Sequence, residues 1–159
     1  MLILALDTSS AAGSAAIARD GVVLAERAGD GTRTHGQRLP RELMAILDAA
    51  GVALHDVDRL AVATGPGSFT GLRVGIATIQ GLALAQHKLV VPVSSFEALA
   101  FVAGPGAAAI APWIDAHRGE VFAVLYGPDG RTQLAPPLVS FERDVRVSSR
   151  ARAAVSASS

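Results

Sequence analysis

Residues 59–75 read Arg-Leu-Ala-Val-Ala-Thr-Gly-Pro-Gly-Ser-Phe-Thr-Gly-Leu-Arg-Val-Gly and indicate the fold class. The apolar run at 59–64 predicts a buried strand. Glycines and a proline over 65–71 predict a loop, and the apolar spacing over 72–86 predicts a long helix. A strand, a glycine-rich loop and a helix in this order are typical of an α/β protein.

The chain before this stretch predicts three strands and a helix. Residues 2–6 form an apolar run that ends at a polar loop, and residues 14–19 and 22–26 flank Asp20-Gly21. A two-residue Asp-Gly connection is a strong hairpin signal, so we expect an antiparallel meander. Apolar residues at helical spacing over 37–50, followed by Gly51, predict a helix, in which Pro40 is tolerated if it lies in the first turn.

The chain after it predicts a strand over 88–93, a helix over 96–102 and strands over 108–114 and 120–126. Beyond Phe141 the apolar periodicity ends, and the last residues are rich in Arg, Ser and Ala. We therefore expect one lobe over residues 1–103, a partial second lobe over 107–141, and a disordered tail over 142–159.

Composition excludes several classes of protein. The 159 residues are 50% hydrophobic and 4% aromatic, and they carry 14 basic and 14 acidic side chains. The zero net charge gives no electrostatic case for a nucleic-acid or membrane-surface binder. The absence of cysteine excludes disulfides and thiolate metal sites. No signal-peptide pattern or membrane-spanning run is found, and we expect a cytoplasmic protein.

Two loops carry candidate nucleotide-binding residues, which are Asp7, Thr8, Ser9, Gly65, Gly67 and Ser68. An acidic residue at a strand end and a glycine loop before a helix could hold a magnesium ion and phosphates. The loop lacks the Walker lysine, and Thr70 stands at the third glycine position of the dinucleotide pattern. An actin-like ATPase or kinase is one alternative, and a tight strand-to-helix turn is the other.

The helix over 72–86 has apolar residues all round it, interleaved with Gly, Ala and Thr. Such a helix must be covered on most sides, either by the chain's own sheet or by a partner's helix. The leucines of the 37–50 helix add a second apolar face. Together the two helices predict a docking surface.

Several runs in the chain resemble the TsaB (YeaZ) family, which has a Gcp-like (peptidase M22-like) domain. These runs are Ile-Leu-Ala-Leu-Asp-Thr-Ser at 3–9, His35 before a Leu-Pro helix, Gly-Pro-Gly-Ser-Phe-Thr-Gly-Leu-Arg at 65–73, and Ile-Asp-Ala-His-Arg-Gly-Glu-Val at 114–121. The resemblance implies an actin-like ATPase (ASKHA, ribonuclease H-like) fold. Because the family is normally longer, it implies a complete N-terminal lobe and a truncated second lobe.

The resemblance also implies a function. Members of the family support the transferase TsaD, which forms N6-threonylcarbamoyladenosine at position 37 of tRNAs reading codons that begin with A. Ser95 and Leu99 stand where TsaD has its metal-binding histidines. We therefore expect a non-catalytic scaffold with no cofactor of its own and no catalytic or metal-binding residue. ATP and metal are expected on the partner subunits, TsaE is a further member of the complex, and tRNA is contacted only indirectly.

The family heterodimerises through its first two helices, which implies an interface with TsaD on the 37–50 and 72–86 helices. Charged substitutions at Leu43 and Ile76 are then expected to abolish binding to TsaD. A self-associating homodimer formed by the same helices is an alternative. The implied interface residues are Leu39, Leu43, Leu47, Arg73, Ile76, Ala77, Gln80 and Leu84.

Overall fold

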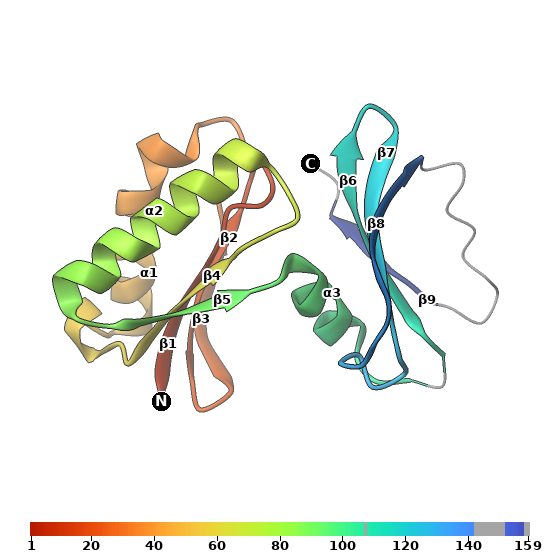
Figure 1. The fold of residues 1–159 in the computed structure, drawn as a ribbon. Coiled ribbons are helices and arrows are strands. Elements are labelled where there is room, and N and C mark those ends of the chain that lie inside the picture. Colours follow the sequence, from red (N-terminus) through yellow and green to blue (C-terminus); the bar gives the residue numbers. More distant parts are fainter. Residues whose placement is uncertain (107, 142–151, 158–159) are drawn as a thin grey trace. The chain divides into compact units, whose positions relative to one another are not determined.

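The computed structural model describes residues 1–106, 108–141 and 152–157 and confirms the expected α/β class (Figure 1). The chain divides into two compact units, one of residues 1–64 and 68–93 and the other of residues 65–67 and 94–159. The elements are β1 (Leu2–Asp7), β2 (Ser14–Arg19), β3 (Val22–Ala28), α1 (His35–Ala50), η1 (Leu54–Asp56), β4 (Arg59–Ala63), α2 (Phe69–Gln86), β5 (Leu89–Val93), α3 (Ser95–Ala103), β6 (Ile110–His117), β7 (Glu120–Tyr126), β8 (Gln133–Phe141) and β9 (Arg152–Ala157).

The first unit is a five-stranded sheet in the order β3-β2-β1-β4-β5. Strands β1 to β3 form the expected antiparallel meander, and β4 and β5 join it in parallel. Asp20 and Gly21 both have positive φ angles, of 51° and 84°, in the turn between β2 and β3. An Asp-Gly pair tolerates this conformation, which explains why the hairpin could be predicted.

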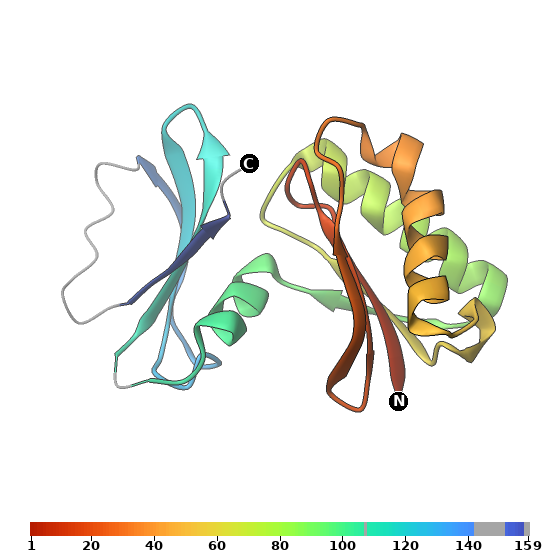
Figure 2. The ribbon, with the colours of Figure 1, turned by 180° about the vertical axis from the view of Figure 1, so that it is seen from behind.

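Helices α1 and α2 cover the same face of this sheet, as the two opposite views show (Figures 1 and 2). Alternate residues of β1 point to that face, and Leu2, Leu4 and Leu6 are buried there. They pack with buried residues of α1, α2 and β4, among them Ile46, Leu60 and Ile79. One continuous apolar core therefore holds the first unit together.

Helix α1 begins at His35, two residues earlier than expected, so Pro40 is its sixth residue and lies beyond the first turn. A proline at that position removes the hydrogen bond that its N–H would donate to the carbonyl of Gly36. The helix ends as predicted at Gly51, which is left-handed with a φ angle of 64°. Helix α2 begins at Phe69, after Ser68, whose hydroxyl accepts a hydrogen bond from Gly71 N.

The second unit has a four-stranded sheet in the order β8-β7-β6-β9. Helix α3 packs on it through Phe96 and Ala100, which share a core with Ile110, Val124 and Tyr126. The strand pairing of this sheet repeats that of the first unit. Strand β6 is antiparallel to β7 and parallel to β9, and in the same way β1 is antiparallel to β2 and parallel to β4. The two sheets therefore share a topology.

Two expectations about the second half differ from the structure. Helix α3 groups with the second unit because it contacts β6, β7 and β9, so the first unit ends at Val93 and not at residue 103. Residues 152–157, expected to be part of a disordered tail, form β9, whose backbone pairs with β6. The rest of the expected tail, 142–151 and 158–159, lies outside the described residues.

Candidate functional site

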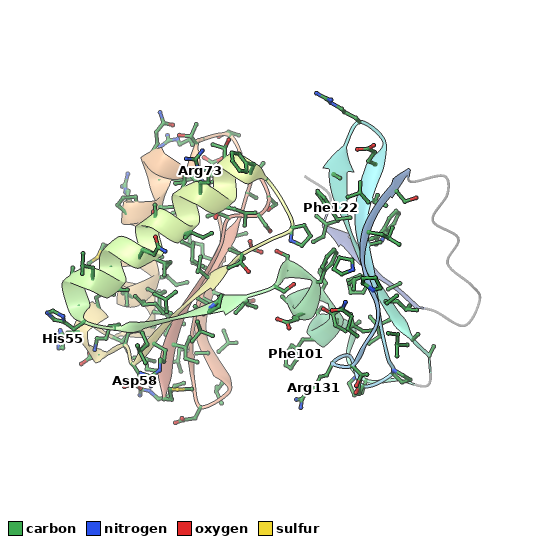
Figure 3. The ribbon with its side chains drawn as sticks, viewed as in Figure 1. His55, Asp58, Arg73, Phe101, Phe122 and Arg131 are labelled. Carbon is green, nitrogen blue, oxygen red and sulfur yellow. The ribbon has the colours of Figure 1, made fainter. Side chains whose placement is uncertain are left out.

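The outer side of α2 carries a row of exposed side chains that we call the α2 stripe: Phe69, Arg73, Ala77, Gln80 and Leu84. At 100° per residue, these positions fall on one side of the helix. Phe69 is 73% exposed and Leu84 is 78% exposed. The Arg73 guanidinium lies 5.2 Å from the centre of the Phe69 ring. Arg73 lies near the first turns of α2 (Figure 3). Two large apolar side chains thus lie open to solvent at the two ends of one helix face.

The structure places the implied interface residues in two different environments. Arg73, Ala77, Gln80 and Leu84 lie together on the α2 stripe, and Ile76 is half-buried against the core. The three leucines of α1 are 2–4% exposed and belong to the core of the first unit; they are Leu39, Leu43 and Leu47.

The burial of these leucines has a simple cause. Helix α1 has one apolar face, and that face lies on the sheet. A buried side chain offers no surface to another protein, and we expect a charge at Leu43 to destabilise the first unit. The large apolar side chain that α1 does expose is Met44, at 55%.

Small residues divide α2 into an outer and an inner side. A Cβ atom on Gly81 would meet nothing within 4 Å, and Gly81 lies beside Ala77 at the edge of the α2 stripe. On the inner side, a Cβ on Gly71 would collide with the Thr8 carbonyl, and one on Gly75 would collide with the Thr8 hydroxyl. The inner glycines therefore bring α2 against β1, while the outer small residues leave room for a second helix to approach closely.

The loop between β1 and β2 is held by hydrogen bonds to its carbonyl groups. Ser9 O accepts from Ser68 N at 2.7 Å, and Gly13 O accepts from Gly29 N at 3.0 Å. Ser10 O lies 3.0 Å from His35 Nε2. The carbonyls of residues 11 and 12 both accept from the Arg38 guanidinium. Five consecutive carbonyls are therefore bonded by donors from α1, from the segment before α1 and from Ser68, the residue before α2.

Two of the candidate nucleotide-binding residues, Asp7 and Ser68, have side-chain hydrogen bonds within the chain, whereas the buried Thr8 hydroxyl has no hydrogen-bond partner. Asp7 Oδ1 accepts a hydrogen bond from Ser9 N at 2.7 Å, which closes the start of the loop. Thr8 is fully buried under α2, and Ser68 caps that helix. The structure thus brings Asp7, Thr8, Ser9 and Ser68 together. Gly65 and Gly67 belong to the second unit.

A cleft of about 470 Å³ lies where α1 and α2 both begin. Beside it, Asp30 and Arg33 form an ion pair of 3.9 Å. Hydrogen bonds from the side chain and backbone of Thr32 lower the pKa of Asp30. The exposed surface of the cleft is mainly apolar, and it is lined by Ala11, Gly31, Thr32, Arg33, Thr34, His35, Gly36, Ser68, Thr70, Gly71 and Val74.

The described ranges contain no group of three or more His, Cys, Asp or Glu side chains that could hold a metal ion. Ser95 is 6% exposed, and its hydroxyl has no hydrogen-bond partner. Leu99 packs against the core of the second unit. An aliphatic side chain cannot bind a metal and a lone serine hydroxyl is a poor ligand, so these two positions do not fit the metal of a TsaD-type site. None of the α-helices in the described ranges is long and apolar enough to cross a membrane.

Sequence reasoning missed one important residue of this region, Arg38. Its side chain is buried, bonds to Glu42 at 2.6 Å and lies 2.7 Å from His35. Arginine is almost never buried unless it is paired, so burial was not expected from residue type. The spacing of Arg38 to His35 and Glu42, three and four residues on one helix, is the signal that could have revealed it.

Comparisons with known proteins agree on one family. A sequence model described as "TsaD: tRNA N6-adenosine threonylcarbamoyltransferase" matches residues 20–148. The chain is 40% identical over 131 residues to the tRNA threonylcarbamoyladenosine biosynthesis protein TsaB of Escherichia coli K12. That match covers 81% of this chain and 56% of the relative, so the chain spans about half the length of this curated relative.

Comparison with solved structures indicates the same family. YeaZ from Pseudomonas aeruginosa superimposes with a TM-score of 0.78 at 37% identity, covering 92% of this chain and 69% of that one. The ethanolamine utilization protein EutJ from Carboxydothermus hydrogenoformans is similar in fold alone, with a TM-score of 0.59 at 16% identity over 89% of this chain and 52% of that one. The chain therefore belongs to the TsaB (YeaZ) family and has the actin-like α/β fold.

Proposed function

We propose that this chain is a non-catalytic scaffold subunit that dimerises with TsaD. In this role it supports the formation of N6-threonylcarbamoyladenosine at position 37 of tRNAs reading codons that begin with A. ATP and metal are held by the partner subunits, TsaE among them, and tRNA contacts this chain only indirectly. The site of action is the cytoplasm.

The α2 stripe is the observation that carries the proposal. Exposed Phe69 and Leu84 supply apolar area, and the small residues between them let a second helix approach. Aromatic and arginine side chains are enriched where protein interfaces gain most of their binding energy, and Phe69 and Arg73 lie in contact here. The proposed interface is thus centred on α2, with Met44 of α1 as a further exposed apolar contact.

The pseudoenzyme part of the proposal is supported by α3. The two positions that resemble the metal-binding histidines of TsaD hold Ser95 and Leu99, which do not form a metal site. Asp7, the alternative catalytic carboxylate, is already bonded to the backbone of its own loop. The described residues of this chain thus favour a supporting role over chemistry of its own.

Co-purification tests the interface. We expect Ala77→Glu to abolish binding of TsaD, because it places a charge at the centre of an apolar contact that binding would bury. Ala77 is exposed, so the variant should fold normally. Ala98→Glu, the same change at an exposed position of α3, is the matched control and should bind TsaD as the unmodified protein does. If the unmodified protein, Ala77→Glu and Ala98→Glu bound TsaD equally well, the α2 stripe would be excluded as the interface.

Sedimentation distinguishes the homodimer. If the isolated protein is a dimer that Ala77→Glu converts to a monomer, and TsaD does not compete for it, then the stripe joins two copies of this chain. If TsaD displaces the second copy, the heterodimer is the functional form.

Nucleoside mass spectrometry tests the function. Depletion of the protein should lower threonylcarbamoyladenosine in cellular tRNA, and only binding-competent variants should restore it. The purified chain should show neither threonylcarbamoyl transfer nor ATP hydrolysis. Metal-dependent turnover by this subunit without TsaD would show that it is an enzyme.

A further inference from the structure

His35 lies at the start of α1 between two partners. Its Nε2 atom is 3.0 Å from the Ser10 carbonyl oxygen, and its Nδ1 atom is 2.7 Å from Nη2 of Arg38. The same Nη2 group also lies within hydrogen-bond distance of the carbonyls of Ala11 and Ala12, and because it carries two N–H groups, one of them is shared between two of these three acceptors. One imidazole and one guanidinium thus bind three consecutive carbonyls of the β1–β2 loop.

The partners determine where the imidazole proton lies. A guanidinium has only donors, so Nδ1 of His35 must accept the hydrogen bond from Arg38. A neutral imidazole carries one N–H, which is then on Nε2 and donates to the Ser10 carbonyl. Both hydrogen bonds form at once only when His35 is neutral and has its proton on Nε2.

Protonation of His35 is incompatible with this arrangement. A proton on Nδ1 would place a donor against the donor of Arg38, with two positive charges in contact. His35 is also the first residue of α1, where the positive end of the helix dipole disfavours a cation. Arg38 cannot move away without leaving Glu42, because Nη1 bonds to Glu42 Oε2 at 2.6 Å in a mostly buried pair.

We propose that His35 and Arg38 form a pH-sensitive latch on the β1–β2 loop. With neutral His35 the latch is closed and the carbonyls of residues 10–12 are bound. When His35 gains a proton, the two side chains separate, and the carbonyls bound by the side chain that moves lose their donor. The loop then loosens, and the contact between Ser9 and the start of α2 weakens with it. The latch lies in the first unit and does not depend on the proposed partner.

Other charged groups near the latch cannot replace His35 as the titrating group. From α1 these are Arg38 and Glu42, which bond to each other. From β3 there is Arg27, which lines a small cavity together with Arg38 and Glu42. From the segment before α1 they are Asp30 and Arg33, which form an ion pair, and from β1 there is Asp7, which bonds to Ser9 N. The loop itself contains no ionisable side chain, and on α2 the charged group is Arg73, which lies over Phe69. None of these side chains is an imidazole, the type of side chain whose ordinary pKa lies between pH 5 and 8.

Nitrogen-15 NMR of the imidazoles in the whole protein tests the latch directly. At pH 8 we expect the nitrogen shifts of His35 to show the proton on Nε2. On acidification, the amide signals of residues 9–13 should shift together with His35. The exposed side chains of His55 and His87 serve as internal references. A proton on Nδ1 of neutral His35, or loop amide signals that do not change as His35 becomes charged, would overturn the proposal.

Amide exchange provides the second measurement. Loss of one hydrogen bond corresponds to at most about a tenfold change in an opening equilibrium. Exchange at Ser68 and Gly29, which donate to the loop, should therefore rise by up to about tenfold beyond its intrinsic pH dependence as His35 titrates. Unchanged exchange through the titration, or a His35 that stays neutral until the whole protein unfolds, would refute a separate latch.

A matched pair of variants completes the test. His35→Gln retains an amide donor for the Ser10 carbonyl but cannot titrate, so the loop signals should lose their pH dependence while the protein stays folded. His55→Gln removes an exposed imidazole and should leave the response of the loop intact. Persistence of the loop response in His35→Gln would assign the titration to another group.

Discussion

Thr8 lies beneath α2 with its side chain fully buried, and Gly75 is the helix residue directly above it. A methyl group at Gly75 would overlap the Thr8 hydroxyl, so the helix would have to move away from β1. We expect Gly75→Ala to lower the free energy of unfolding by about 1–3 kcal/mol, the usual cost of overpacking a core. Chemical denaturation measures this change.

Gly81→Ala is the matched control on the same helix. A methyl group at Gly81 meets nothing within 4 Å, and alanine favours a helix over glycine by about 1 kcal/mol. This variant should therefore be more stable than the unmodified protein. If the two variants had equal stabilities, the close approach of α2 to Thr8 would not limit the packing.

Asp129 is the residue whose pKa is lowered most clearly. Hydrogen bonds from the Thr132 side chain and from the backbone of Arg131 and Thr132 lower the pKa of Asp129 from its ordinary value of 3.8 to about 2. Its charged form thus supports the turn between β7 and β8 above about pH 4. This contribution to stability is lost as the pH falls through about 2, because the unfolded chain takes up the proton at a higher pH than the folded chain does.

Carbon-13 NMR of the side-chain carboxyl groups measures the Asp129 titration. In Thr132→Ala the largest of the contributions that lower the pKa of Asp129 is absent, so this pKa should rise toward 3.8. In Thr132→Ser the hydroxyl remains, and the pKa should stay low. An equal pKa in the two variants would assign the shift to the backbone amides alone.

For single residues, the sequence patterns identified important positions better than they identified what those residues do in the structure. Gly65 to Gly75 drew attention to the start of α2, but the reason for Gly71 and Gly75 is a contact with Thr8, which is over 60 positions away in the chain. Likewise, leucines at helical spacing in α1 are equally consistent with a core and with an interface, since periodicity shows that a face is apolar and not what covers it. The three-dimensional packing assigns Leu43 to the core.

Helix α3 depends on its first turn, because it has only nine residues. Ser94 Oγ accepts from Phe96 N at 3.2 Å, and Glu97 Oε2 accepts from Ser94 N at 3.3 Å, which is a capping box. We expect Ser94→Ala to lower the free energy of unfolding by about 1 kcal/mol. Guanidinium denaturation measures the loss.

Ser94→Asp is the matched variant, since a carboxylate accepts the same hydrogen bond at a helix N-terminus. It should keep most of the stability of the unmodified protein. Equal losses in Ser94→Ala and Ser94→Asp would indicate that the hydroxyl acts in another way than capping.

Most elements of the fold were predictable because their signals are local. The Asp20-Gly21 hairpin, Gly51 after α1 and the apolar run of β4 each specify a conformation over a few residues. Strand β8 was not expected, since Pro136 and Pro137 are typical of loops. As an edge strand it tolerates residues without an N–H donor, and β7 provides its pairing. Strand β9 also arises from pairing with a distant strand, for which the sequence carries no local signal.

The two units of the molecule have separate cores. One is built from α1, α2 and the first sheet, and the other from α3 and the second sheet. Destabilising one core should therefore leave the other unchanged. We expect Gly75→Ala to speed hydrogen exchange in β1 and β4 by up to roughly a hundredfold, while β6 and β7 keep their rates. Mass spectrometry of exchanged peptides measures both. A uniform increase across the chain would show that the units unfold as one.

Strands β6 and β7 also determine what optical spectroscopy can detect. The chain contains a single tryptophan, Trp113 on β6, and a single tyrosine, Tyr126 on β7. Both lie in the second unit, so intrinsic fluorescence excited at tryptophan and tyrosine wavelengths reports on that unit alone. The first unit, with most of the helix, contributes chiefly to far-ultraviolet circular dichroism. A melting curve that differs between the two signals thus separates the units without a label, and agreement between them indicates a concerted transition.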